Sequence, residues 1–151
     1  MSVVNNGETN FYRAVEEART LIKRAPRGHA FSLILGGPSP SGILLDPTTD
    51  RTELAAALDD LAPLDGAMAT YEALTLASLS LARGDHPAKQ IVILTDEQNI
   101  GWEIGKSGRW NFLREAFKNL PSEPQIMLRT LPLPEFIRNL AVVEVSLSRD
   151  I

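Results

Sequence analysis

The apolar run at residues 91–94 constrains the fold of this chain more than any other stretch. It stops abruptly at Thr95 and Asp96, and it is short and rich in β-branched residues, which favours a strand over a helix. Such a run is typical of a parallel strand that is buried on both faces. Because ligands of open α/β sheets bind beyond the carboxyl ends of the strands, Asp96 is the first candidate functional residue. The alternative is that Asp96 caps the following turn.

Helical and strand patterns alternate along the chain. Asp50 and Glu53 have the spacing of a capping box, which predicts the start of a helix that ends before Pro63. Apolar residues at helical spacing predict three further helices, over residues 11–24, 70–83 and 110–120. Strands are predicted over residues 29–35, 43–45, 91–94, 125–131 and 140–147, whereas residues 1–10 read as a polar loop. This alternation indicates right-handed βαβ units and a mostly parallel sheet that is covered on both faces.

The short connection between segments 29–35 and 43–45 indicates an antiparallel hairpin at a sheet edge. At the other end of the chain, Pro132 and Pro134 resemble a linker, and the strand pattern at 140–147 alternates apolar and polar residues. We therefore expect one α/β domain over residues 1–133, followed by a linker and a strand over residues 134–151.

Composition narrows the class of function. The chain has 151 residues, 44% of them hydrophobic, and a net charge of -4 without a basic run, so we expect no nucleic acid partner. It has no cysteine, which excludes thiol catalysis and thiolate metal sites. No apolar stretch is long enough to cross a bilayer and no signal peptide is visible, so the chain is expected to be soluble as written. Its compartment stays open.

Four sequence segments follow one another in the order found in a known family: FSLILGG, LDPTTDRTELAAALDDL, GAMATYEALTLA and ILTDEQN. With these segments the chain resembles a von Willebrand factor A domain over roughly residues 5–133. The resemblance implies a three-layer α/β/α sandwich with one antiparallel edge strand. It also implies a domain that binds a protein partner at the carboxyl edge of its sheet.

The resemblance further implies a metal-ion-dependent adhesion site. In this family a D-x-S-x-S loop, a Thr and an Asp hold a divalent cation, and Thr70 and Asp96 stand at the last two positions. Hydroxyl and carboxylate oxygens suit Mg²⁺, and an open coordination position can take a partner's carboxylate. The D-x-S-x-S loop does not occur in this chain, so the expected Mg²⁺ site is incomplete. The alternative for Thr70 is that its hydroxyl only caps the helix that follows.

The same resemblance implies that the first, central strand of the sheet is missing, because SVVNNGETNFYRA looks like the sequence that follows it. The chain would then be truncated, with two unpaired edges at strands 29–35 and 91–94. Three alternatives remain open: residues 140–147 insert there, another chain donates a strand, or the two flanking strands pair with each other. Donation between copies would make a homo-oligomer.

The ending NLAVVEVSLSRDI resembles the opening strand of a β-sandwich module that follows the A domain in bacterial membrane-anchored proteins of the aerotolerance-operon type. On that interpretation the chain is an internal segment of a longer protein, which we call the parent protein. Only the parent protein would attach it to a membrane. The alternative function is therefore a structural fragment of such a parent, with no site of its own.

Other candidate residues have simpler explanations. Ser39 and Ser41 lie in a Pro-rich turn, and His29 and His86 lie at breaks between elements without a second ligand nearby in sequence. The indoles at positions 102 and 110 border the loop after Asp96, where exposed aromatics would form a binding patch, although core packing is the favoured reading of the second. No nucleophile and base pattern is visible, so we predict no enzyme activity, and a small α/β hydrolase is the least favoured function.

Overall fold

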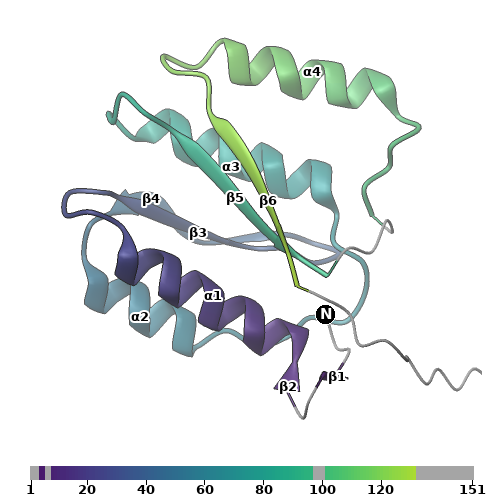
Figure 1. The fold of residues 1–151 in the computed structure, drawn as a ribbon. Coiled ribbons are helices and arrows are strands. Elements are labelled where there is room, and N and C mark those ends of the chain that lie inside the picture. Colours follow the sequence, from purple (N-terminus) through teal and green to yellow (C-terminus); the bar gives the residue numbers. More distant parts are fainter. Residues whose placement is uncertain (1–3, 6–7, 97–100, 132–151) are drawn as a thin grey trace, which may run out of the picture.

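The chain forms two half-sheets between two pairs of helices. The structure is a computed structural model that describes residues 4–5, 8–96 and 101–131, with side chains from residue 9 onwards. Helices α1 and α2 cover one face and α3 and α4 cover the other (Figure 1). The elements are β1 (Val4–Asn5), β2 (Glu8–Thr9), α1 (Asn10–Arg24), β3 (Phe31–Leu35), β4 (Ser41–Thr48), α2 (Arg51–Asp59), α3 (Thr70–Arg83), β5 (Gln90–Thr95), α4 (Ser107–Lys118) and β6 (Gln125–Thr130).

The strands pair in twos. β3 and β4 form an antiparallel hairpin, and β5 and β6 form a parallel pair in uninterrupted register from Gln90↔Gln125 to Thr95↔Thr130. Within the described residues β3 and β5 are not hydrogen-bonded to each other, so one continuous sheet is not formed. Of the three alternatives left open by the sequence, direct pairing of these two strands does not occur in the described residues, while the mixed α/β fold with an antiparallel edge is confirmed.

Helix boundaries follow from local chemistry. The carboxylate of Asp50 accepts hydrogen bonds from the backbone nitrogens of Thr52 at 2.8 Å and Glu53 at 3.2 Å, so α2 begins where the capping pattern predicts. Helix α3 covers the predicted range, and Lys89 binds its last turn: the buried ammonium donates to the carbonyl oxygen of Gly84 at 2.7 Å and to that of Leu81. Cations at a helix C-terminus are favourable because unpaired carbonyls gather there.

Two hydrophobic clusters lie on opposite faces. The cluster beneath α3 and α4 is built from Leu74, Ala77, Ile91, Leu113 and Phe117. The cluster beneath α1 and α2 is built from Ile22, Leu54 and Leu58, with side chains of β3 and β4 against it. Each face of the strands thus has its own packed core.

Several details differ from the sequence-based expectations. Residues 4–5 and 8–9 pair as a small antiparallel ladder where a loop was predicted. β4 is longer than its apolar run, since backbone pairing with β3 continues into polar residues. The strand predicted over residues 140–147 and the domain boundary at 133 lie outside the described residues. Among the helices that are described, none combines the length and the apolar character needed to span a bilayer.

Candidate functional site

Three loops meet where β3 and β5 end. The backbone nitrogen of Ala69 donates to the carbonyl oxygen of Gly37 at 2.9 Å, which ties the start of α3 to the end of β3. The backbone nitrogen of Thr70 donates to the carbonyl oxygen of Gly101 at 3.3 Å, which ties the same helix start to the loop after β5. Carboxyl ends of strands are where α/β folds place their ligand sites.

Thr70 is the first residue of α3 and is only 1% exposed. The cap position is occupied by Ala69 and the helix start has no side-chain cap hydrogen bond, so the capping interpretation of Thr70 is wrong. Its Oγ1 atom has no hydrogen-bond partner among the described residues. A buried hydroxyl without a partner costs free energy, which marks this position as one where a ligand atom would be accepted.

Asp96 directly follows β5 and is 5% exposed. It lines the same cavity as Thr70, an elongated one that extends along β3 and β5. The turn that Asp96 was alternatively expected to cap falls in residues 97–100, which lie outside the described part of the chain. A carboxylate this deeply buried requires a partner in the folded protein.

The donor set fits a hard divalent cation in part. One hydroxyl and one carboxylate are oxygen ligands of the kind that Mg²⁺ takes together with several waters. In the described residues, however, no cluster of three or more His, Asp or Glu side chains could enclose a metal. Two protein oxygens are fewer than a metal cage supplies, so any cation here would depend on water and partner oxygens.

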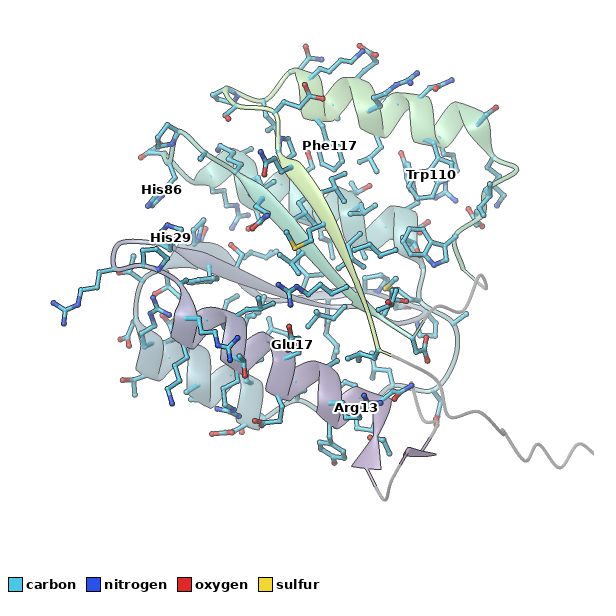
Figure 2. The ribbon with its side chains drawn as sticks, viewed as in Figure 1. Arg13, Glu17, His29, His86, Trp110 and Phe117 are labelled. Atoms are coloured by element: carbon cyan, nitrogen blue, oxygen red, sulfur yellow. The ribbon has the colours of Figure 1, made fainter. Side chains whose placement is uncertain are left out.

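A second buried polar residue at this end was missed by the sequence analysis. Asn10 begins α1 and is fully buried, and its Oδ1 accepts a hydrogen bond of 3.0 Å from Arg13. Its amide nitrogen has no partner among the described side chains. Arg13 lies near the start of α1, close to the point where β6 ends (Figure 2). The sequence signal that could have found this residue is an Asn directly before a predicted helix. Its burial could not be predicted, because burial depends on tertiary packing.

An ion-pair network connects the described part of the loop after Asp96 to α3 and α4. Arg109 of α4 pairs with Glu72 of α3 and with Glu103 of the loop, and Lys106 pairs with Glu103 at 2.7 Å. The hydrogen bond from Arg109 lowers the pKa of Glu72 from its ordinary value of 4.5, and the one from Lys106 is the main cause of a lowered pKa at Glu103. The guanidinium of Arg109 also lies 4.1 Å from the ring centre of Tyr71.

The indoles divide between core and surface. Trp110 packs against the core beneath α4 and meets the ring of Tyr71 edge-on at 6.2 Å, which confirms its core role (Figure 2). Its Nε1 donates to the carbonyl oxygen of Glu103 at 3.2 Å. Trp102 borders both the cavity that contains Asp96 and a shallow open depression next to Ile104, which is 74% exposed. An apolar surface therefore adjoins the candidate site, as the sequence indicated.

The two histidine candidates line the same cavity at its opposite end. His29 and His86 lie where β3 and β5 begin (Figure 2), and Nε2 of His86 is 3.0 Å from the carbonyl oxygen of Gly28. Ser39 and Ser41 are exposed and do not line the cavity; Ser39 lies in the turn as predicted, whereas Ser41 is the first residue of β4. Thr70 and Asp96 therefore line one end of the cavity, and the two histidines line the other.

Comparison with known proteins supports the resemblance. No curated protein matches the chain. The family model described as von Willebrand factor type A domain matches residues 1–98, which extend from the N-terminus past β5 and include both Thr70 and Asp96. The match covers more than half of the chain, and the chain therefore belongs to the von Willebrand factor type A domain family.

Proposed function

We propose that this chain is a protein-binding module whose contact surface is centred on Thr70 and Asp96 at the carboxyl end of β5. Domains of its family generally mediate protein interactions and are generally not catalytic. The observation that carries the proposal is the buried Thr70 hydroxyl, which has no hydrogen-bond partner within the described residues and lines the same cavity as the Asp96 carboxylate. The Thr70 hydroxyl without a partner supports a role for this position in accepting a ligand atom.

We further propose that the partner contacts the apolar surface formed by Trp102 and Ile104 beside this cavity. Binding interfaces place apolar side chains near a small number of polar groups that fix orientation. The ion pairs of Arg109 hold the loop that carries both residues, so this surface is organised before a partner arrives. A non-catalytic role agrees with the absence of a nucleophile and base pattern in the sequence.

A divalent cation is the second element of the proposal. Thr70 Oγ1 and the Asp96 carboxylate would supply two oxygen ligands to Mg²⁺, which would offer an open coordination position to an acidic side chain of the partner. With two protein ligands the affinity is expected to be weak. The partner would thus strengthen cation binding, and the cation would strengthen partner binding, because the partner's acidic side chain binds the cation directly.

Thermal unfolding tests the cation. Titration with Mg²⁺ or Mn²⁺ is expected to raise the Tm of the chain, because a ligand that binds the folded state stabilises it. The increase should vanish in Asp96→Asn and Thr70→Val and persist in Asp65→Asn, which alters an exposed carboxylate outside this cavity. No increase in the unmodified chain, or an equal increase in all three variants, would contradict the proposed ligands.

Affinity capture tests the partner surface. Proteins retained by the immobilised chain are quantified and compared with those retained by Ile104→Asp and Phe112→Asp, which both place a charge at an exposed apolar residue. A specific partner is expected to be lost with Ile104→Asp and kept with Phe112→Asp, because Phe112 does not border the depression beside Trp102. Equal retention by all three proteins would count against this surface.

A further inference from the structure

The side chain of Met68 packs on the backbone that follows β3. Met68 belongs to the loop that joins α2 to α3, lies two residues before Thr70 and is half-buried. A Cβ atom built on Gly36, the residue directly after β3, would lie 2.5 Å from Sδ of Met68 and 2.9 Å from its Cγ. The thioether therefore lies directly against Gly36, a close approach that a residue without a side chain permits.

The backbone of Met68 makes a second contact, with the loop after β5. Its carbonyl group lies where a Cβ atom on Gly101 would be. The next two amides hold this arrangement. The nitrogen of Ala69 donates to the carbonyl oxygen of Gly37 at 2.9 Å, and the nitrogen of Thr70 donates to that of Gly101 at 3.3 Å. Met68 thus lies between the two loops to which the start of α3 is tied.

A thioether in this position can be modified chemically. Hydrogen peroxide transfers one oxygen atom to the sulfur of a methionine: the O–O bond breaks, an S=O bond forms, and the other oxygen leaves as water. The sulfur is oxidised by two electrons and the peroxide is reduced by two. The product, methionine sulfoxide, is polar and needs water or a hydrogen-bond donor at its oxygen. An apolar side chain is thereby replaced by one that is poorly suited to a packed contact.

The contact with Gly36 leaves no room for this oxygen on the side of the sulfur that faces the backbone. The sulfoxide therefore has to turn its oxygen toward water, which rotates the Met68 side chain off Gly36. The loop before α3 then loses its packing on the end of β3. Because Ala69 and Thr70 follow directly, their backbone hydrogen bonds to the two neighbouring loops weaken with it.

Met127 offers a comparison within the same chain. The chain has three methionines and no cysteine, so few sulfur atoms compete for the oxidant. Met127 lies on β6, outside these loops, and is 39% exposed. Its sulfoxide would meet solvent without displacing a packed loop. Met1 lies outside the described residues. Oxidation of Met127 should therefore leave the start of α3 unchanged.

We propose that Met68 is a modification site that a peroxide converts to the sulfoxide, and that this conversion opens its contacts with Gly36 and Gly101. The opening weakens the ligand site at Thr70 and Asp96. This second step rests on the function proposed above, whereas the opening of the loops does not. The modification is reversible, since methionine sulfoxide reductases restore the thioether.

Treatment of the full chain with hydrogen peroxide provides the test. Peptide mass spectrometry locates each added oxygen, and hydrogen–deuterium exchange followed by NMR reports on individual amides. In the oxidised chain, exchange of the Ala69 and Thr70 amides is expected to accelerate at least about tenfold, while α2 stays unchanged. A Met68 that stays unoxidised while Met127 reacts would overturn the proposal, and so would a Met68 sulfoxide without faster exchange.

Two matched variants identify the sulfur that is responsible. Met68→Leu keeps an apolar side chain of similar size but cannot form a sulfoxide. Peroxide should no longer accelerate exchange at Ala69 and Thr70 in this variant, whereas Met127→Leu should respond like the unmodified chain. Equal responses in the two variants would contradict the assignment to Met68.

Enzymatic reduction repeats the test without a substitution, so it decides the question even if Met68→Leu does not fold. The oxidised chain is treated with both methionine sulfoxide reductases, because each reduces one epimer of the sulfoxide. Slow exchange at Ala69 and Thr70 should return. If the thioether is restored and exchange stays fast, another oxidised side chain causes the opening and the proposal is wrong.

The effect on the ligand site is measured separately, with Mg²⁺ as the probe. The increase in Tm that Mg²⁺ produces in the reduced chain is expected to fall at least about twofold after oxidation of Met68. An equal increase in both forms would refute the link between Met68 and the site. No increase in either form would contradict the cation ligands of the proposed function alone, and the exchange measurement would then still decide whether Met68 controls the loops.

Discussion

The guanidinium of Arg129 on β6 donates a hydrogen bond of 2.6 Å to the carboxylate of Glu17 on α1. These residues are 112 positions apart in the chain, and their contact joins α1 to the parallel half-sheet (Figure 2). Because the two half-sheets share no backbone ladder in the described residues, contacts made by the helices hold them together. The pair is partly exposed, with side-chain exposures of 45% and 30%.

Glu17→Gln is expected to lower the free energy of unfolding by at most about 1 kcal/mol, because partly exposed ion pairs contribute little. Its local effect should be larger: exchange of β6 amides should accelerate, since Arg129 no longer holds α1. Urea unfolding and hydrogen exchange measure the two effects. Glu16→Gln is the control, because it breaks the pair of Glu16 with Arg19 inside α1 and does not contact β6. Equal acceleration in both variants would exclude a bridging role.

Lys89→Met is expected to destabilise the chain by about 1–3 kcal/mol. The substitution keeps the apolar stem of this buried side chain but removes the ammonium that binds the carbonyl oxygens of Leu81 and Gly84. These carbonyls at the end of α3 would lose a charged donor. Urea denaturation gives the change, with Lys118→Met as a control in which the lost partner, Glu115, is exposed. A loss as small as that of Lys118→Met would refute the capping role of Lys89.

Gly101→Ala should disturb the candidate site, whereas Gly105→Ala should not. Gly101 has a φ of +92°, and a Cβ atom there would collide with the carbonyl of Met68. A Cβ on Gly105 meets nothing within 4 Å. We expect a stability loss of about 1–3 kcal/mol for the first variant and less than about 0.5 kcal/mol for the second. Thermal unfolding gives both values, and a similar result for the two glycines would contradict this account.

Thr70→Val should be neutral or stabilising by up to about 1 kcal/mol, because it replaces a buried hydroxyl that lacks a partner with a methyl group of similar size. Thr75→Val on the same helix removes a hydrogen bond of 2.8 Å to the carbonyl oxygen of Tyr71 and should cost about 0.5–1.5 kcal/mol. Urea unfolding compares them. A larger loss at Thr70 than at Thr75 would mean that the Thr70 hydroxyl has a structural partner.

Acid should weaken the loop beside Asp96. The pKa values of Glu72 and Glu103 are lowered in the folded chain, so the unfolded chain binds more protons at mildly acidic pH. Their contribution is complete above the ordinary value of 4.5 and is lost as the pH falls through the lower folded values. The fluorescence of the adjacent indoles between pH 6 and pH 2 should report this loosening. Arg109→Met should shift the transition to higher pH, and an unchanged transition would contradict the network.

Local patterns were enough to predict much of this fold. The range of α3 follows from its apolar residues, the start of α2 from Asp50, and the end of β5 from the change at Asp96. These features depend on neighbours a few positions away in the chain. The strand pattern at the end of β5 and the helix start at Thr70 also located the candidate site.

Features that depend on distant segments were not predictable. Nothing in the sequence near Lys89 indicates that its ammonium binds the end of α3, or that Arg109 would contact Glu72. Similarly, the unpaired hydroxyl of Thr70 depends on what the loop at Gly101 leaves open. These properties arise from tertiary packing, which overrides local preference wherever buried polar groups must find partners.

The division of the strands into two pairs has a consequence for cooperativity. In a continuous sheet, opening one strand disturbs the ladder of the next, so that the whole sheet tends to unfold as a unit. Here the hairpin β3–β4 and the parallel pair β5–β6 share no backbone ladder within the described residues, and they are coupled through side-chain packing and loop contacts. The two pairs can thus behave as separate foldons with their own opening free energies. A strand bound between them would merge two local equilibria into a single global one.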